Sequence, residues 1–247
     1  MNRKASLKIF ETPLILAEAF AKEFKIICDE FILKNGFVNV ALSGGNTPKL
    51  LFEILAKNYI SSIDWKRINF YWVDERCVNA ESNESNYGET ERILFSKINI
   101  QNNIHRITGE NDPEEEALRY SGLLKSNLPE INNFPKFDIV LLGMGDDGHT
   151  ASIFPDQLNL LESDKICEVA VHPSSGQKRI TLTGKVINNS EKIIFLITGK
   201  SKAEVIKDIF ENKNESDRFP AAHIKSTEGE VIWYLDEEAG SLLNQKF

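Results

Sequence analysis

Residues 137–155 read FDIVLLGMGDDGHTASIFP, and this stretch decides the fold class. Ile139 to Leu142 are a short run of branched apolar residues, which is typical of a strand buried on both faces. The run ends in a turn with three glycines, Gly143, Gly145 and Gly148. Glycines let the backbone turn sharply and approach a ligand closely. The turn also carries the groups that a proton-transfer site needs, from Asp146, Asp147 and His149.

The same glycines match the G-x-G-x-x-G pattern that follows a strand in dinucleotide-binding proteins. We reject a dinucleotide site, because Asp146 and Asp147 would repel a pyrophosphate at contact distance. A plain strand-to-helix turn with solvated carboxylates is the alternative that the local sequence leaves open.

The size and charge of the chain restrict its class. Its 247 residues fit one large α/β domain or two small ones. The net charge of -8 argues against a nucleic-acid or anionic-membrane partner, because no run of Lys and Arg offsets it. No apolar stretch is long enough to span a bilayer, and the opening residues MNRKASLKIFETP contain no signal-peptide core. We therefore expect a cytoplasmic protein with no membrane partner.

The cysteines and histidines suggest neither a disulfide nor a metal site. Cys28, Cys77 and Cys167 are odd in number, far apart and without metal-like spacing, so we expect reduced thiols. The four histidines show no pairing suited to a metal ion, and we expect no metal. His105 alternates with apolar residues in a strand expected at 104–107, which indicates a structural role.

Strands and helices alternate along the chain. Further strands are expected at 8–10, 38–42, 68–73, 168–171, 193–198, 219–222 and 231–235. The longest helix begins with Thr12 as N-cap and Pro13, and it ends at Asn35-Gly36. Its apolar face comprises Leu14, Ala17, Phe20, Ala21, Phe24, Ile27, Cys28 and Phe31. This pattern predicts a single Rossmann-like α/β domain over residues 1–247, with a mostly parallel twisted sheet and helices on both faces.

The strand at 38–42 is followed by SGGNTP at residues 43–48. Thr47 can cap and Pro48 can open the next helix, which we expect to reach about Tyr59. A strand, a turn of small residues and a helix N-terminus form an anion cradle, because free N–H groups and the positive dipole end point at one place. The turn is not a Walker A loop. A tight turn without a ligand fits these residues equally well.

Asp74, Glu75 and Arg76 follow the strand at 68–73. Ligands bind at the carboxyl ends of strands in open α/β sheets, so a charged triplet there points to a site. A weak surface ion pair between Asp74 and Arg76 is the alternative. Residues 85–88 are expected in the loop before a helix at about 89–95.

Two later cations are also candidates for the site. Arg179 begins an alternating segment and could face either solvent or the site. Lys202 lies in the first turn of a helix expected from about Lys200 to Phe210. A cation at that position opposes the helix dipole, which favours a bound anion nearby.

Four stretches in this order resemble the 6-phosphogluconolactonase family, in the wider group that includes glucosamine-6-phosphate deaminases and ribose-5-phosphate isomerases. They are ALSGGNTPKLLFEIL, WVDERCVNAESNESNYGETERILF, FDIVLLGMGDDGHTASIFP, and KRITLT followed by ITGKSKAEVI, from about residue 40 to the end. DGHTASIFP is specific, because the deaminases typically continue Asp-Gly-His with an Ile-Ala-Phe-Asn type of sequence. Asn79 departs from the family, which usually has Pro there. This change affects the stiffness of residues 77–80 but removes no reacting group.

The resemblance implies a carboxylic ester hydrolase that converts 6-phospho-D-glucono-1,5-lactone to 6-phospho-D-gluconate in the oxidative pentose phosphate pathway. No cofactor is required. His149 is the candidate for both proton transfers, and either Asp74 or Asp147 would orient its ring. Arg76 would hold the lactone oxygen or the developing negative charge.

The resemblance also implies a set of groups that bind the substrate and its phosphate. These are Ser43, Gly44, Gly45, Thr47, Gly148, Arg179 and Lys202. A nucleophilic mechanism is disfavoured, because Ser152 and Thr150 follow His149 without a Gly-x-Ser-x-Gly elbow. Cys77 beside Arg76 is a candidate thiolate, although an inert thiol is the default expectation.

Two other functions remain open at this stage. In a glucosamine-6-phosphate deaminase or sugar-phosphate isomerase, Asp74 would abstract a C2 proton and His149 would help to open the ring. The segment from Thr150 to Pro155 favours the lactonase instead. A non-catalytic sugar-phosphate sensor is the second alternative, although about 40 residues before the first glycine turn leave no room for a helix-turn-helix. We favour a monomer and leave self-association open.

Overall fold

The apolar runs of the sequence form the centre of a six-stranded sheet in the computed structural model, which describes residues 6–98, 100–211 and 216–244. Residues 1–5, where the opening segment was searched for a signal sequence, lie outside this description. The strand order is β1 (Ser6–Phe10), β11 (Glu230–Asp236), β10 (Lys192–Ile197), β7 (Ile139–Leu142), β2 (Val38–Leu42) and β3 (Ile68–Trp72). Every neighbouring pair is parallel.

The parallel pairing brings all six carboxyl ends to one edge of the sheet. From β2 the chain moves outward to β3, whereas β7 later joins the opposite side of β2. The loops after β2 and β7 therefore diverge at a switch point, which is where open α/β sheets bind ligands. The fold thus places the two glycine turns of the sequence next to one another.

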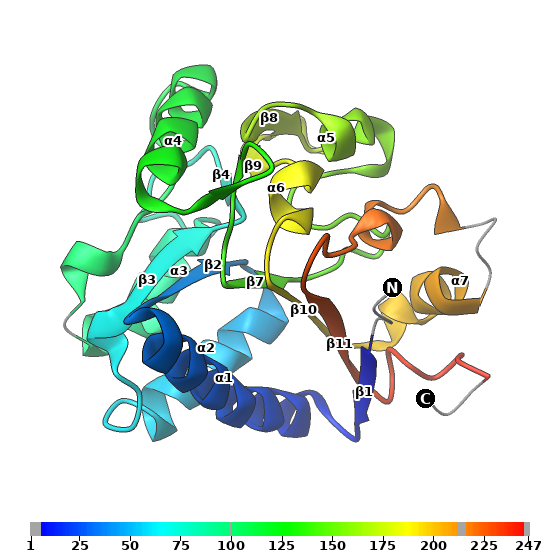
Figure 1. Cartoon of the computed structure of the whole chain (residues 1–247). Coiled ribbons are helices and arrows are strands. Elements are labelled where there is room, and N and C mark those ends of the chain that lie inside the picture. Colours follow the sequence, from blue (N-terminus) through cyan, green and yellow to red (C-terminus); the bar gives the residue numbers. More distant parts are fainter. Residues whose placement is uncertain (1–5, 99, 212–215, 245–247) are drawn as a thin grey trace.

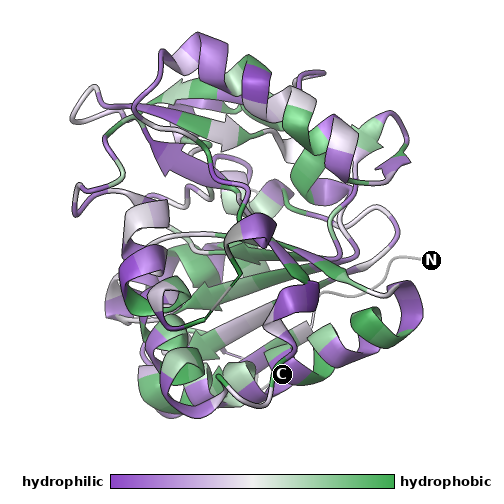
Figure 2. Cartoon of the chain, turned by 90° about the vertical axis from the view of Figure 1, so that its left-hand side faces the viewer, coloured by the Kyte–Doolittle hydropathy of each residue, from purple (hydrophilic) through white to green (hydrophobic). Residues whose placement is uncertain are grey.

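Helices cover both faces of this sheet, as predicted (Figure 1). Side chains alternate between the two faces along a strand. On β11, Tyr234 packs against Phe20 of α1 (Pro13–Asn35), with ring centroids 5.1 Å apart. The preceding residue, Trp233, packs against Phe210 of α7 (Ala203–Glu211), with centroids 5.3 Å apart. The helices α1 and α7 therefore lie on opposite faces. In Figure 2 the strands of the main sheet are largely hydrophobic, whereas the helices alternate between hydrophobic and hydrophilic residues.

The predicted limits of α1 are confirmed. The Thr12 side chain accepts a hydrogen bond from Ile15 N, and Gly36 ends the helix with a left-handed φ of 84°. One residue of the predicted apolar face is wrong: Leu14 is 50% exposed, and Leu16 is buried in its place. Both lie in the first turns, where the periodicity alone did not fix the buried edge. No helix in the described ranges is both long and apolar enough to cross a membrane.

A second sheet, absent from the sequence-based prediction, lies beside the main one (Figure 1). It is antiparallel, in the order β4 (Asp74–Arg76), β9 (Lys178–Leu182) and β8 (Cys167–Val171). Helix α4 (Pro113–Asn127) packs against β8 and β9. Val73 joins the two sheets, because its N–H donates to Leu42 O and its carbonyl accepts from Leu182 N.

The remaining elements are short, apart from α2 and α3. They are α2 (Asn46–Asn58), α3 (Asn86–Ile93), α5 (Asn159–Glu162), α6 (Gly184–Asn188), β5 (Glu130–Ile131) and β6 (Phe134–Pro135). The 3-10 helices are η1 (Trp65–Arg67), η2 (Phe95–Lys97), η3 (Gln101–Asn103), η4 (Pro155–Gln157), η5 (Lys200–Lys202) and η6 (Pro220–His223).

Three expectations about these elements are wrong. Residues 104–107 form no strand, because only Ile104 bridges to Phe70 at the edge of the sheet. Residues 219–222 enter η6 instead of a strand, since Pro220 lacks the N–H of a ladder residue. Helix α3 begins at Asn86, three residues early, because Ser85 caps it and Gly88 fits closely under Ala80 O. His105 is structural as expected: its ring stacks on Tyr71 with centroids 4.7 Å apart, and burial lowers its pKa.

We predict that Tyr120→Phe destabilises the protein by about 1–3 kcal/mol. The hydroxyl of Tyr120 is fully buried, accepts a hydrogen bond from Trp72 N at 2.9 Å and donates one to Trp72 O at 3.1 Å. Its loss leaves two buried backbone groups unpaired where β3 ends. Urea denaturation measures the effect, with Tyr59→Phe as the control because the hydroxyl of Tyr59 has no described hydrogen bond. Equal stability of the two variants would contradict the prediction.

Candidate active site

A cavity of about 420 Å³ opens where the parallel strands end. The loops after β2 and β7 contribute to its wall, and so do the small strands β4 and β9. Most of the predicted site residues line it. Those from the first half of the chain are Ser43, Gly44, Gly45, Thr47, Asp74 and Arg76. Those from the second half are His149, Arg179 and Lys202. Asp147 and Gly148 lie outside the lining.

Asp147 contacts the side of His149 that bears Nδ1. Its Oδ1 lies 2.6 Å from His149 Nδ1 and also accepts a hydrogen bond from the backbone N–H of His149. Burial alone would raise the pKa of Asp147, but the hydrogen bond and charge of His149 outweigh it and lower that pKa to about 2. The ionised carboxylate favours the tautomer with a proton on Nδ1. Nε2 is therefore the ring nitrogen left to act in the cavity.

Two glycines of this turn allow the close packing around His149. A Cβ on Gly145 would lie 2.1 Å from His149 Nδ1, and one on Gly148 would lie 2.5 Å from the ring of Phe219. Gly148 also has a left-handed φ of 78°, which glycine adopts without strain. Its carbonyl accepts a hydrogen bond from Ala221 N. Gly148, expected to bind substrate, therefore shapes the turn behind the cavity.

The turn after β2 presents a helix N-terminus to the cavity. Helix α2 begins at Asn46, with Gly45 as its N-cap at φ 108° and no side chain accepting from the first turn. The prediction that Thr47 caps this helix is wrong: Thr47 lies within it, and its Oγ1 is hydrogen-bonded to Thr198 Oγ1 at 2.8 Å. Since no side chain caps the turn, its N–H groups remain available to an anion.

Two cations lie opposite each other on the second sheet. Arg76 of β4 pairs directly with Arg179 of β9 in the antiparallel register. Burial lowers the pKa of Arg179, the negative charge of Asp74 acts against this, and the positive charge of Arg76 lowers the pKa further. Like charges directly across a strand pair are destabilising, and an anion between them would relieve that repulsion. The pair is therefore a candidate for binding an anion.

Unpaired polar atoms point to the same cavity. Among the described residues, three buried side-chain atoms lack a hydrogen-bond partner: Ser43 Oγ, Arg76 Nε and Trp72 Nε1. The first two belong to residues that line the cavity. Buried polar atoms are normally paired, so these two atoms indicate a ligand with hydrogen-bond acceptors.

Asp74 lines the same cavity, but its carboxylate is hydrogen-bonded to neutral side chains instead of to His149 or Arg76. Its Oδ2 accepts a hydrogen bond from Ser152 Oγ at 2.6 Å, and its Oδ1 accepts one from Asn86 Nδ2 at 3.3 Å. The alternative of a surface ion pair with Arg76 is wrong, because Asp74 is 5% exposed and bonded to these neutral groups. Sequence reasoning missed the contribution of Asn86, assigned to a loop, and weighed Ser152 only as a nucleophile.

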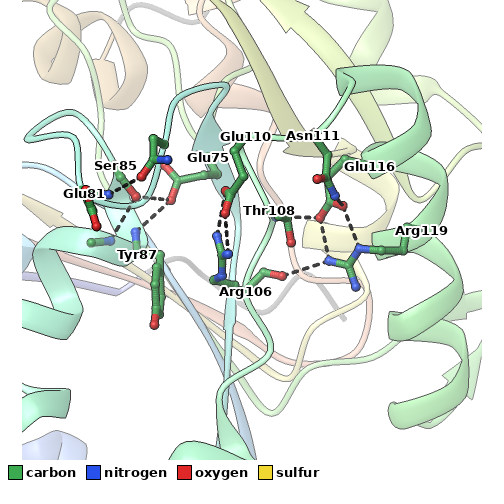
Figure 3. A network of polar contacts seen from close by, with 12 residues as sticks. Glu75, Glu81, Ser85, Tyr87, Arg106, Thr108, Glu110, Asn111, Glu116 and Arg119 are labelled. Carbon is green, nitrogen blue, oxygen red and sulfur yellow. Dashed lines mark hydrogen bonds and ion pairs between the residues drawn. The ribbon is translucent and has the colours of Figure 1, made fainter.

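Glu75 fixes the segment from which these groups project (Figure 3). Its buried carboxylate accepts hydrogen bonds from four donors. These are Arg76 N, Asn86 N and Tyr87 N, each at 2.8 Å, and Ser85 Oγ at 3.0 Å. A carboxylate at the start of α3 also interacts favourably with the helix dipole. Burial nevertheless raises the pKa of Glu75. One side chain therefore positions the backbone of both Arg76 and Asn86.

A second buried carboxylate in Figure 3, that of Glu116, holds the neighbouring loop. It accepts hydrogen bonds from Thr108 N at 2.6 Å and Asn111 Nδ2 at 3.0 Å, and it pairs with Arg119. None of these partners lines the cavity. Glu116 is thus as buried as Glu75 and also accepts from several donors, but one of its partners is a cation and it positions residues outside the cavity.

Lys202 lines the cavity in contact with another acidic side chain. It forms an ion pair with Asp146, whose Oδ1 also accepts a hydrogen bond from Ser201 Oγ at 2.9 Å. From the sequence, Asp146 is one of the groups suited to proton transfer, but its carboxylate is bonded to Lys202 and Ser201 and not to His149. The pairing of Lys202 with a carboxylate was not expected from the sequence.

Cys77 is no thiolate. It does not line the cavity, and burial together with the charge of Glu75 raises its pKa to about 11. Asn79, where the resembled family usually has Pro, accepts a hydrogen bond from Glu81 N and so forms a turn by other means. Within the described residues, no group of three or more His, Cys, Asp or Glu side chains is arranged to hold a metal ion.

The sheet, its switch point and this cavity define an α/β protein in which a His–Asp contact lies beside two arginines and an uncapped helix N-terminus. A family model for glucosamine-6-phosphate isomerases and 6-phosphogluconolactonases matches residues 11–233. The chain therefore belongs to the glucosamine-6-phosphate isomerase/6-phosphogluconolactonase family.

Similar proteins narrow the comparison within the family. A 6-phosphogluconolactonase of Haemophilus influenzae is 45% identical over 222 residues, which cover 88% of this chain and 94% of that protein. The crystal structure of the devB protein is 42% identical with a TM-score of 0.90, covering 96% of this chain and 99% of that one. The 6-phosphogluconolactonase of Trypanosoma brucei is 28% identical with a TM-score of 0.87, covering 96% and 98%.

We predict that Glu75→Gln weakens the binding of inorganic phosphate and also lowers the free energy of unfolding. The amide offers one acceptor oxygen to the four donors, and its NH₂ group opposes the rest, which costs about 1–3 kcal/mol. Arg76 and Asn86 then lose their anchor. Glu116→Gln is the matched control: it should lower stability similarly while leaving phosphate affinity unchanged. Urea denaturation and calorimetric titration with phosphate measure the two effects. Equal phosphate affinity in both variants would contradict the role of Glu75 in positioning Arg76 and Asn86 for anion binding.

Proposed function

We propose that the chain hydrolyses 6-phospho-D-glucono-1,5-lactone to 6-phospho-D-gluconate, a step of the oxidative pentose phosphate pathway, in the cytoplasm and without a cofactor. The names of the relatives at 42–45% identity support this substrate. The observation that carries the proposal is the contact of Asp147 with His149, which lines a cavity together with Arg76 and Arg179. We propose that residues 1–247 act as one unit and as a monomer.

In the proposed reaction His149 moves both protons. Nε2 takes a proton from water, whose oxygen then attacks the lactone carbonyl carbon and forms a tetrahedral oxyanion. Asp147 keeps Nδ1 protonated and stabilises the imidazolium. The intermediate collapses by breaking the bond between the carbonyl carbon and the ring oxygen. Nε2 returns its proton to that oxygen, so the ring opens to the hydroxy acid.

Arg76 is proposed to hold the oxyanion, and three groups are proposed to hold the phosphate. The phosphate group carries close to two negative charges at neutral pH. The turn from Ser43 to Thr47 offers backbone N–H groups, while Arg179 and Lys202 offer charge. Asp74, tied to Ser152 and Asn86, would orient the substrate rather than His149.

A paired assay tests the function. One arm follows 6-phosphogluconate formed from freshly generated lactone, against the enzyme-free rate, because the lactone also hydrolyses spontaneously. The other arm follows ammonia released from glucosamine 6-phosphate. Lactone turnover without ammonia is the expected result. Ammonia without lactone turnover would make the chain a deaminase, and binding without either reaction would make it a sensor.

We predict that His149→Ala lowers kcat by about 100-fold or more and changes KM little. The variant loses the general base and acid, but it keeps the residues that are proposed to bind the phosphate. Stopped assays against the spontaneous rate give both constants. A His149→Ala enzyme with the kcat of the unmodified protein would refute the assignment of the base.

Arg179→Ala should act mainly on KM, raising it about tenfold, since the side chain is proposed to bind the phosphate equally in the substrate and in the transition state. Arg218→Ala is a suitable control, because that exposed arginine does not line the cavity. A fall in kcat with unchanged KM would instead assign Arg179 to the reacting centre.

A further inference from the structure

The cavity that is proposed to take a phosphate dianion also holds carboxylates, and each of them has a different partner. Asp74 is bonded to the neutral groups of Ser152 and Asn86. Asp147, just behind the lining, is bonded to His149. Asp146 differs from both, because its partner Lys202 is one of the cations that are proposed to bind the phosphate. An acid in this place needs an explanation, because it repels the proposed ligand.

The contacts of Asp146 resemble those of a bound anion. Its Oδ1 accepts from both the hydroxyl of Ser201 and the ammonium group of Lys202, which are neighbours in η5 after β10. The hydrogen bonds from Lys202 and Ser201 lower the pKa of Asp146, so the group is ionised at neutral pH. The side chain of Lys202 is 19% exposed and that of Asp146 is 67% exposed.

We propose that Asp146 is an internal competitor: its carboxylate occupies Lys202 and Ser201 in the free protein, and a phosphate group must displace it to bind. This inference rests on the proposed function only in taking the ligand to carry a phosphate group. Asp146 thereby lowers the affinity of the site for phosphate in the substrate, in the product and in inorganic phosphate alike.

The exposure of Asp146 makes displacement feasible. An ion pair whose carboxylate is mostly in solvent is partly screened by water, so breaking it costs less than breaking a buried pair. A side chain that is mostly in water can rotate away from Lys202 without burying its charge. A phosphate dianion offers three acceptor oxygens and more charge than a carboxylate, so it competes effectively. Weaker anions meet the same barrier with less binding energy, and the site stays free of them.

Removing the competitor should tighten phosphate binding. For Asp146→Asn we expect the Kd of inorganic phosphate and of 6-phosphogluconate to fall about threefold to tenfold, from the lost ion pair and the lost repulsion together. The KM for the lactone should fall by a similar factor. Asp156→Asn is the control, because it removes the same charge from an exposed residue outside the cavity lining.

A double-mutant cycle with Lys202→Met gives the decisive test. Calorimetric titration with inorganic phosphate is made on the unmodified protein, both single variants and the double variant. The tightening from Asp146→Asn should largely vanish when Lys202 is absent. Undiminished tightening without Lys202, weaker or unchanged binding in Asp146→Asn, or no phosphate binding in any variant would each overturn the proposal. The titration needs no turnover, so a protein that binds phosphate but does not hydrolyse the lactone would refute the proposed function and leave this result standing.

Discussion

The parallel pairing of β2, β7 and β10 is the constraint on which the site depends. It brings to one edge of the sheet three loops that lie roughly fifty to one hundred residues apart in the sequence. None of these loops is a site alone: one offers helix N–H groups, one an imidazole and carboxylates, and one a lysine. The cavity forms because β2, β7 and β10, the strands that carry these loops, are buried and paired in a fixed register.

The electrostatic design is local. The chain carries a net charge of -8, yet the cavity has the features of an anion site. Carboxylates near it have their acceptor positions filled by donors: Glu75 by backbone N–H groups, Asp74 by Ser152 and Asn86, and Asp147 by His149. Arg76 and Arg179 instead face one another across a strand pair. The charges that line the cavity act on a bound anion more strongly than distant surface charges do, because water and salt screen the distant charges.

The sequence predicted the parts of the site that depend on local chemistry. Branched runs marked β2, β7 and β10, and strand-end motifs marked most of the residues that line the cavity. It did not predict which carboxylate contacts His149, or that Asp146 pairs with Lys202 across 56 positions of sequence. It also missed the antiparallel sheet of β4, β9 and β8, because these strands are short, and β4 is far from β8 and β9 in the sequence, so nothing local indicates that they pair. Thr47 has a side chain that is common at N-caps, but the helix starts at Asn46, with Gly45 as its N-cap.

Successive side chains of β4 point to opposite faces of the strand, and this alternation decides which of them reach the cavity. Asp74 and Arg76 point to one face of this strand, opposite Thr181 and Arg179, while Glu75 between them points to the other. The same alternation therefore sends Glu75 to the start of α3 and its neighbours into the cavity wall. A slip of one residue that moved Arg76 to the position of Glu75 would bury a guanidinium where the helix needs an acceptor. Thr181 opposes this slip, because its Oγ1 accepts from Ser152 N, and Ser152 in turn holds Asp74. The register of Asp74, Glu75 and Arg76 is thus supported by neutral side chains that also hold the Asp74 carboxylate in the cavity wall.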